Sequence, residues 1–420
     1  MNNKRRIAFV SVRYGLDING GAELHCRMLA ERLALRHDVE VLTTCVKDYV
    51  KGSNEYPAGE EAMNGVLVRR FAAAPPDHAG ERRWLEMAKP ARRLRMRLYQ
   101  AGLLRAVSAF AGTWTWKLKE DVEAQKCTVF YSADLLRYLS EHRDSYDAFI
   151  VFSSNFPLFY FSAMAVGDKT LAVPLLHKMK ASFRVSLDQA FSRIRYVGFN
   201  TDAEMKLGKD IFGTAIRDCG IIGTGIGLTA PAPWEQVRRK YSLPDRYALF
   251  IGRIDTDKTG RMAEYYSSYR KRYGDDALPL VVMGKTYEQE AAAEGMIYTG
   301  FVSEEDKRAM LLHARVLINP SEYESLSLVL LEAMHDRVPA LVNGRCKVFR
   351  KHREKSDGAV QCYRSARDFI SKLHKMDTDE AERLMMQEKG ERYMKENYCW
   401  EIIMDRLEKA LDKVSAAESK

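Results

Sequence analysis

Residues 320–334 read PSEYESLSLVLLEAM, and they follow a short apolar run, Val316–Ile318. The pattern predicts a strand, a Pro-Ser turn and then an apolar helix. Glu332 lies inside the apolar run, where an unpaired charge costs several kcal/mol, so we expect it to have a dedicated partner. Glu324 lies eight positions earlier, near the expected helix N-terminus, where free backbone N–H groups favour anions. Two interpretations follow: a binding site, or a core helix with one polar residue facing a loop.

Two cations lie on a second loop, which follows the apolar run Tyr247–Gly252. Arg253 and Lys258 belong to its sequence GRIDTDKTG. Ligands of α/β sheets bind at the carboxyl ends of strands, and two cations there suit a diphosphate. Asp255 and Asp257 form an Asp-x-Asp pattern, but we interpret them as solvated loop acids because no His or Cys cluster with ligand spacing accompanies them.

Length and composition predict two globular domains, because 420 residues exceed one ordinary core and 46% of them are hydrophobic. Seven cysteines without a C-x-x-C pair indicate a reducing, cytoplasmic compartment. Both halves alternate strand-like and helix-like stretches, which predicts an α/β fold with parallel, helix-covered sheets. The expected strands are 7–12, 39–44, 148–152, 170–173 and 196–200, then 247–252, 280–284, 297–300, 316–319 and 340–342.

The strand, the Pro-Ser turn, the E-x7-E spacing and the R-x4-K pair together resemble the donor site of the retaining GT-B glycosyltransferases of family 4, the glycosyl transferases group 1. The resemblance extends over most of the chain. It implies two Rossmann-like domains with parallel sheets that face each other across a cleft. The expected parts are an acceptor-side domain at 1–225 with a basic insert at 82–119, a hinge at 226–236, a nucleotide-sugar-binding domain at 237–397, and a helix at 398–420 that crosses back to the first domain.

The resemblance also implies roles for residues of the second domain. Glu324 would contact hydroxyls of the donor sugar, and Glu332 would contact the ribose of the nucleotide. The backbone around Ser327 and Leu328 would contact the diphosphate between them. If all eight residues from Glu324 are helical, they rise ~12 Å, about the reach from a sugar to a ribose.

Arg253 and Lys258, by the same resemblance, neutralise the nucleotide diphosphate as it leaves. They would act by preorganised electrostatics, so we expect no essential metal and no cofactor. A glycosidase would also use two carboxylates, but at separations of ~5 Å or up to ~9.5 Å, which the expected helix rise does not match.

Two motifs of the first domain match the resemblance in part. Gly20, Gly21 and Glu23 fit a G-G-A-E loop that closes over the donor, although a mere tight turn would explain the two glycines as well. His177 follows an expected strand where family members often carry His-Asp near the reacting sugar. Lys178 stands in place of that Asp, and a structural histidine is the alternative interpretation.

The resemblance predicts an enzyme: a retaining, hexosyltransferase-type glycosyltransferase. It would move a sugar from a UDP- or GDP-linked donor to a saccharide or lipid-linked saccharide acceptor, in bacterial cell-surface polysaccharide or lipopolysaccharide biosynthesis. The alternative is a catalytically inactive GT-B protein that serves as a membrane- or partner-binding subunit. The family's E-G-F-G-L is ESLSL here, and Lys347 stands where an acidic residue is common, which supports that alternative.

The net charge of +9 equals the charge of one segment, 82–119, which holds ten Lys or Arg and one Glu. Its apolar residues recur at steps of three and four, so we expect an amphipathic helix. Two interpretations stay open: an interfacial helix on the anionic inner face of the plasma membrane, or an internal helix with solvated cations. Nucleic acid is not an expected partner, because no known binding motif accompanies the cations.

Overall fold

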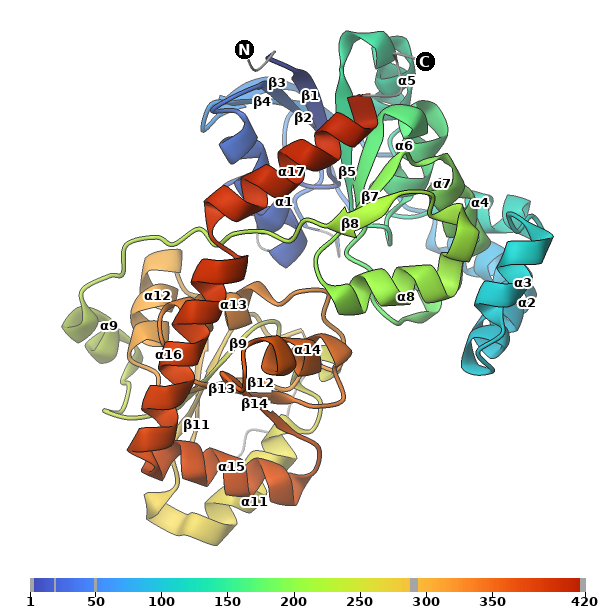
Figure 1. Ribbon diagram of the computed structural model, residues 1–420. Coiled ribbons are helices and arrows are strands. Elements are labelled where there is room, and N and C mark those ends of the chain that lie inside the picture. The colour runs from blue at the N-terminus through green and yellow to red at the C-terminus, as the bar shows by residue number, and fades with distance from the viewer. Residues whose placement is uncertain (1–3, 19, 49–50, 288–293, 416–420) are drawn as a thin grey trace. The chain divides into compact units, whose positions relative to one another are not determined.

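The computed structural model describes residues 4–18, 20–48, 51–287 and 294–415, and its internal contacts divide the chain into two compact units. Unit 1 comprises Met1–Thr224 and Trp400–Lys420, and unit 2 comprises Gly225–Cys399. Each unit contains one sheet of mainly parallel strands with covering helices (Figure 1). The predicted α/β class with two parallel-sheet domains is confirmed.

Unit 1 is built on a sheet in the order β3-β4-β2-β1-β5-β6-β7-β8. All neighbours pair in parallel except β3 and β4, which are antiparallel. The central strands are buried throughout, as their near-continuous apolar sequences predict. The strands are β1 (Arg6–Val10), β2 (Asp38–Thr44), β3 (Gly59–Met63), β4 (Val66–Phe71), β5 (Ala148–Phe152), β6 (Thr170–Val173), β7 (Tyr196–Phe199) and β8 (Cys219–Ile221).

Nine α-helices of the described residues belong to unit 1, and the last of them is the C-terminal helix α17. Its apolar stripe, which includes Leu407 and Leu411, is buried against β5, β6 and β7. His37 Nε2 lies 3.0 Å from Glu408 Oε1 of this helix. The helices are α1 (Gly21–Leu33), α2 (His78–Gln100), α3 (Leu104–Ala111), α4 (Leu118–Lys126), α5 (Ala133–Glu141), α6 (Pro157–Val166), α7 (Val185–Arg193), α8 (Asp202–Phe212) and α17 (Trp400–Ser415).

Unit 2 contains a fully parallel sheet in the order β11-β10-β9-β12-β13-β14. Its strands are β9 (Ala248–Ile251), β10 (Leu280–Met283), β11 (Met296–Gly300), β12 (Val316–Asn319), β13 (Ala340–Asn343) and β14 (Val360–Tyr363). Its helices are α9 (Trp234–Tyr241), α10 (Thr256–Thr259), α11 (Met262–Tyr273), α12 (Glu304–Leu312), α13 (Leu328–His335), α14 (Lys347–Lys355), α15 (Ala366–Thr378) and α16 (Glu380–Asn397).

Four strands were not among those expected from the sequence: β3, β4, β8 and β14. All four lie in the outer parts of the sheets, where strands are short or half exposed and the apolar run is interrupted. The expected hinge at 226–236 also ends differently. Its last residues, from Trp234 on, belong to α9, and just before them the Ala232 N–H donates to the Glu305 carbonyl at 3.1 Å within unit 2.

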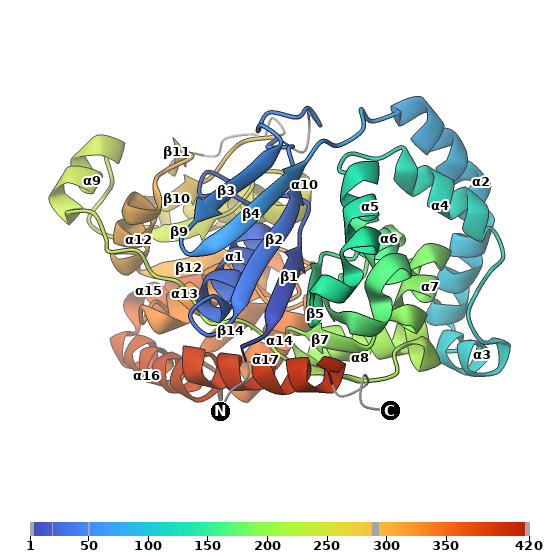
Figure 2. The same cartoon turned by 90° about the horizontal axis from the view of Figure 1, so that it is seen from above.

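The basic segment 82–119 forms parts of three helices, α2, α3 and α4, instead of one (Figure 2). Arg95 faces inward and is fully buried, with Nη1 3.1 Å from Asp188 Oδ1. Met96, Tyr99 and Trp114 pack on the core of unit 1. The apolar stripe is therefore largely internal, and one of the expected surface cations is a core residue.

The positive charge is also less localised than a single segment implies. Residues 345–355, which include α14, hold six Lys or Arg and one Glu. Acidic residues elsewhere offset this second basic region in the total, so the net charge alone did not indicate it.

Candidate functional site

The candidate site of unit 2 lies at the carboxyl ends of β9 and β12. These strands are neighbours, and the chain continues from β9 to β10 on one side and from β12 to β13 on the other. That reversal is the switch point at which open α/β sheets bind ligands, because the loops diverge there and leave a crevice. The loop after β9 carries Arg253 and Lys258, and the loop after β12 carries Glu324.

The loop after β9 is held by Asp255. Its side chain caps the short helix α10 by accepting a hydrogen bond from the Lys258 N–H at 3.0 Å, and its Oδ2 lies 3.3 Å from Arg253 Nε. Asp255 is only 8% exposed, so the expectation of a solvated loop acid is wrong for this residue. The Asp255 carboxylate therefore positions both cationic residues of the loop, Arg253 through its side chain and Lys258 through its backbone.

The loop after β12 is pinned by Asn319, the last residue of the strand. Its Oδ1 accepts from the Ser321 N–H at 3.2 Å, and its Nδ2 donates to Ser327 Oγ at 3.1 Å. Between these two anchors lies Glu324, whose Oε1 is 2.6 Å from Lys258 Nζ. The structure thus brings together one predicted cation and one predicted carboxylate from loops 66 residues apart in sequence.

The helix α13 begins later than expected. It starts at Leu328, so Glu324 lies in the preceding loop and only the second half of the E-x7-E segment is helical. The expected ~12 Å of helix rise between the two carboxylates is therefore wrong, and their spacing in the sequence does not exclude a glycosidase. The helix breaks here because Ser327, its N-cap, has a left-handed backbone with φ 73°.

The N-terminus of α13 carries no side-chain cap. The first N–H groups of a helix have no carbonyl partner within it, and together with the helix dipole they favour an anion. Ser327 and Leu328, the residues expected to contact the diphosphate, are located at this N-terminus. A serine accommodates the left-handed turn at Ser327, where the family pattern has glycine, at a cost of about 1–2 kcal/mol.

Glu332 is buried and has a cationic partner, Lys307, as expected for a buried carboxylate. Its Oε1 lies 3.2 Å from Nζ of Lys307, a residue of α12 that also contacts Glu304 at 2.6 Å. Burial raises the pKa of Glu332, and Lys307 lowers it in part. The second oxygen, Oε2, is buried without a hydrogen-bond partner among the described residues. Sequence analysis missed Lys307, because the only signal was the need for some cation.

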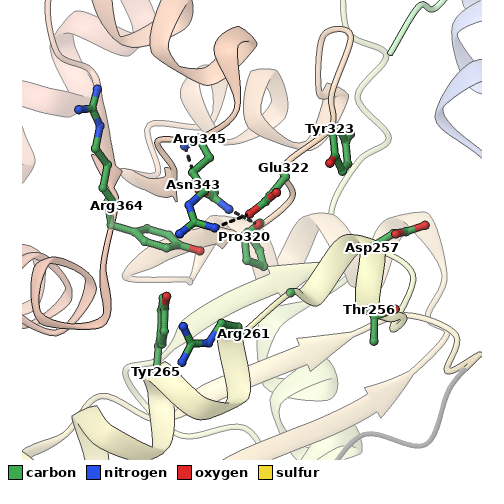
Figure 3. A pocket seen from close by; sticks show the side chains of 12 residues that line it. Thr256, Asp257, Arg261, Tyr265, Pro320, Glu322, Tyr323, Asn343, Arg345 and Arg364 are labelled. Atoms are coloured by element: carbon green, nitrogen blue, oxygen red, sulfur yellow. Dashed lines mark hydrogen bonds and ion pairs between the residues drawn. The ribbon is translucent and has the colours of Figure 1, made fainter. Parts of the chain in front are cut away.

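A cavity of about 240 Å³ adjoins these loops. Glu322 and Arg345 form a 3.2 Å ion pair on one side of it, and Arg261 and Tyr265 lie on the facing side (Figure 3). The cavity is lined by residues 256–257, which directly precede Lys258, and by residues 322–323, which directly precede Glu324. None of the predicted donor-site residues lines it.

The predicted residues of unit 1 lie at the carboxyl ends of its central strands. Gly20 and Gly21 form the N-terminus of α1, where the Glu23 carboxylate folds back and pairs with Arg13 at 2.6 Å. A Cβ at Gly20 would lie 2.1 Å from Glu23 Oε2, so any other residue there would have to displace the Glu23 carboxylate.

His177 follows β6 and is partly buried. The residue before it, Leu176, donates its N–H to Glu204 Oε1 at 2.5 Å. Glu204 also accepts from the Asn200 N–H at 2.7 Å, and burial raises its pKa to about 8. Sequence analysis missed Glu204, the buried acid that holds the loop with His177.

The described part of the chain contains no group of three His, Cys, Asp or Glu side chains that could hold a metal ion. Among the helices that the structure describes, none combines the length and the hydrophobicity of a transmembrane segment.

Residues 245–379 match the model of the family described as Glycosyl transferases group 1. The sequence has no significant match among curated proteins. Among solved structures, a sucrose-phosphate synthase from Thermosynechococcus elongatus has a TM-score of 0.67 at 15% identity, covering 99% of this chain and 100% of its own. The trehalose-6-phosphate synthase OtsA has a TM-score of 0.68 at 12% identity, covering 96% and 98%.

The Anabaena protein HepE, solved in complex with UDP and glucose, has a TM-score of 0.65 at 11% identity and covers 97% of this chain and 99% of its own. These structures show that the chain has the GT-B fold over nearly its whole length. The residues that match the family model, 245–379, lie within unit 2, which also contains the candidate site.

Proposed function

We propose that this protein is a retaining glycosyltransferase of family 4. It takes a sugar from a UDP- or GDP-linked donor and transfers it to a saccharide or lipid-linked saccharide acceptor. The observation that carries the proposal is the pairing of Lys258 with Glu324 at a strand switch point, beside the uncapped N-terminus of α13. A similar structure holds UDP and glucose, which supports a nucleotide-sugar donor.

In this proposal the diphosphate lies at the N-terminus of α13, against the backbone of Ser327 and Leu328. Lys258 has three N–H donors, so it can keep Glu324 and still bind a phosphate oxygen. Arg253 adds a second cation, and both stabilise the charge that develops as the nucleotide diphosphate leaves. No metal is needed for this step, because the two cations and the helix N-terminus already face the negative charge.

The two carboxylates hold the donor at its ends. Glu324 orients the sugar through its hydroxyls. Glu332 uses Oε1 for Lys307 and is left with Oε2, which has no partner in the described residues and can accept a ribose hydroxyl. Neither is assigned as a nucleophile. Gly20, Gly21 and His177 of unit 1 are proposed to contact the donor and the reacting sugar.

Isothermal titration with UDP and with GDP tests the donor site. We expect micromolar binding of one of them, and Glu332→Ala should abolish it. Glu304→Ala is the matched control, because Glu304 is the exposed partner of the same Lys307 and should leave binding unchanged. If the wild type binds neither nucleotide, the protein is the inactive subunit that the ESLSL departure suggested.

Turnover with a panel of nucleotide sugars and lipid-linked acceptors tests the reaction. We propose an acceptor from cell-surface polysaccharide or lipopolysaccharide synthesis, used in the cytoplasm at the inner face of the plasma membrane. The anomeric configuration of the product, read from its proton coupling constants, distinguishes retention from inversion. An inverted product would refute the family 4 mechanism.

Membrane contact is proposed for the outer face of α2 and α3. These helices lie at the outer edge of unit 1 (Figure 2). Exposed residues of α2 recur at helical spacing, with Met87, Pro90 and Leu94 between Arg83 and Arg97. The mixture of exposed apolar and cationic side chains suits an anionic bilayer.

The neighbouring helix α3 and the residues beside it add exposed apolar side chains to this surface. Phe110 is 93% exposed, an unusual degree for an aromatic side chain, and Leu103 and Trp116 beside the helix are about half exposed. Flotation with anionic vesicles should therefore fall when Leu94 and Phe110 are both changed to Ser. Equal flotation of wild type and variant would reject the surface. Leu384→Ser in α16 is a control with similar exposure.

A further inference from the structure

A buried histidine contacts the loop of the proposed donor site from behind. His352 belongs to α14, a helix whose other polar residues are mostly exposed cations, yet its own side chain is 2% exposed. Its Nε2 lies 3.1 Å from the carbonyl oxygen of Leu326. Leu326 is located between Glu324 and Ser327, in the turn that leads into α13.

The other ring nitrogen is also bonded. His352 Nδ1 lies 3.1 Å from the hydroxyl of Tyr393 in α16, and that hydroxyl lies 3.4 Å from the hydroxyl of Tyr398. Both tyrosines are buried. We refer to His352, Tyr393 and Tyr398 as the His-Tyr chain.

The hydrogen bonds of the His-Tyr chain can run in only one direction, because not every atom in it can donate. A carbonyl oxygen can only accept, so Nε2 carries the proton and donates to Leu326. Nδ1 is then the acceptor of a neutral imidazole and receives the Tyr393 hydroxyl proton. Burial supports this assignment, because it lowers the pKa of His352 to about 4.

The loop needs such support because its backbone is strained. Ser327 has φ 73°, a conformation that a non-glycine residue keeps only when its surroundings determine it. Two hydrogen bonds hold this conformation. The Asn319 amide donates to Ser327 Oγ, and the His352 imidazole bonds the carbonyl of Leu326, one residue earlier. Without the second contact, the turn has a route to relax.

We infer that His352 is a positioning residue of the donor site, which fixes the turn from Glu324 to Ser327 so that its N–H groups and carboxylate meet the diphosphate and the sugar. The inference rests on the proposed function. It goes beyond it by assigning preorganisation of this loop to a residue that itself touches no substrate. The ribose contact at Glu332, one helical turn further along α13, should not depend on it.

The test compares His352→Asn with His352→Gln. The amide nitrogen of Gln can occupy the place of Nε2 and donate to Leu326, whereas the amide of Asn reaches only the place of Nδ1. Titration uses whichever of UDP or GDP binds the wild type, together with the corresponding monophosphate. We expect His352→Asn to weaken diphosphate binding about tenfold, the value of one hydrogen bond, and His352→Gln to restore most of it.

Monophosphate binding separates positioning from general destabilisation. It should change less than twofold in His352→Asn, because the ribose end of the site is intact. Equal loss of both ligands, or no loss of the diphosphate, would overturn the inference. His313→Asn is the control, since His313 bonds a carbonyl elsewhere in unit 2. If His352→Asn does not fold, Tyr393→Phe removes the donor to Nδ1 and should weaken the diphosphate in the same selective way.

Hydrogen exchange gives a readout that needs no ligand. In His352→Asn the amides of Leu330 and Leu331, which donate to the Ser327 carbonyl at 3.1 and 3.2 Å, should exchange faster than in the wild type, while those of β9 keep their rates. If the wild type binds no nucleotide, the proposed function fails and exchange alone decides the inference. Faster exchange then supports the part of the inference that concerns the protein alone, that His352 fixes the turn before α13, and unchanged exchange refutes it.

Discussion

Glu332→Gln should separate ligand binding from stability at the proposed donor site. Glu332 is 5% exposed, and its two oxygens differ: Oε1 contacts Lys307, and Oε2 has no partner among the described residues. Gln keeps the shape of the side chain and removes its charge. We expect the free energy of unfolding to stay within about 1 kcal/mol of the wild type, while nucleotide affinity falls about tenfold.

The stability estimate comes from two opposing contributions. Gln loses the charged hydrogen bond to Lys307, which is worth about 1.5–3 kcal/mol. It also avoids the desolvation of a buried carboxylate, an effective penalty of several kcal/mol. Lys307 keeps Glu304 at 2.6 Å, so the variant leaves no buried cation without an anion. The two contributions therefore nearly cancel.

The affinity estimate follows from the acceptor strength of the free oxygen. Hydrogen bonds to an ionised acceptor are about twice as strong as those between neutral groups. Replacing the carboxylate with an amide therefore costs roughly 1.4 kcal/mol at the ribose, which is a factor of ten.

The pH dependence of stability has a definite sign. Burial raises the pKa of Glu332 above its ordinary value of 4.5. Between these two pKa values the folded protein holds a proton that the unfolded chain has lost, so the stability contribution of this group falls as pH rises. Gln has no such loss. The stability of Glu332→Gln relative to the wild type should therefore increase as the pH rises above 4.5.

Urea unfolding at pH 5, 6.5 and 8, combined with titration calorimetry, measures both quantities. Glu304→Gln serves as the control and should keep nucleotide affinity. A loss of more than about 3 kcal/mol at pH 6.5 together with unchanged nucleotide binding would show that Glu332 is only a structural counter-ion of Lys307.

Three further predictions test the structure in experiments that need no ligand. Arg95→Met should cost about 3–5 kcal/mol because it leaves Asp188 buried without its cation, and adding Asp188→Asn should recover most of that in urea unfolding; a loss under 1 kcal/mol would contradict the burial of Arg95. Ser327→Ala should have a free energy of unfolding about 1 kcal/mol lower than that of Ser327→Gly, because both variants lose the hydrogen bond to Asn319 but only Gly adopts φ 73° freely. The reverse order would contradict the left-handed turn. Thermal stability should fall from pH 5 to 8 in part through Glu204, whose pKa burial raises to about 8, so Glu204→Gln should flatten that slope; an unchanged slope would show that the carboxyl is ionised throughout.

Much of the fold could be predicted locally. Apolar runs such as Ala148–Phe152 and Thr170–Val173 are strands with the expected bounds, because strands buried on both faces are apolar throughout. Strands at the outer parts of the sheets, such as β3, are exposed and lack that signal. The late start of α13 was also hidden, since nothing in ESLSL indicates a left-handed serine.

The need for partners could be predicted from sequence, whereas their identity could not. An acid in the apolar run at Glu332 requires a cation, because an unpaired buried charge is costly. Tertiary structure decided that Lys307 serves Glu332 and that Lys258 meets Glu324. It also turned Arg95 inward and placed His352 behind Leu326. These pairings depend on strand order and helix packing between distant segments, which a local pattern of residues does not encode.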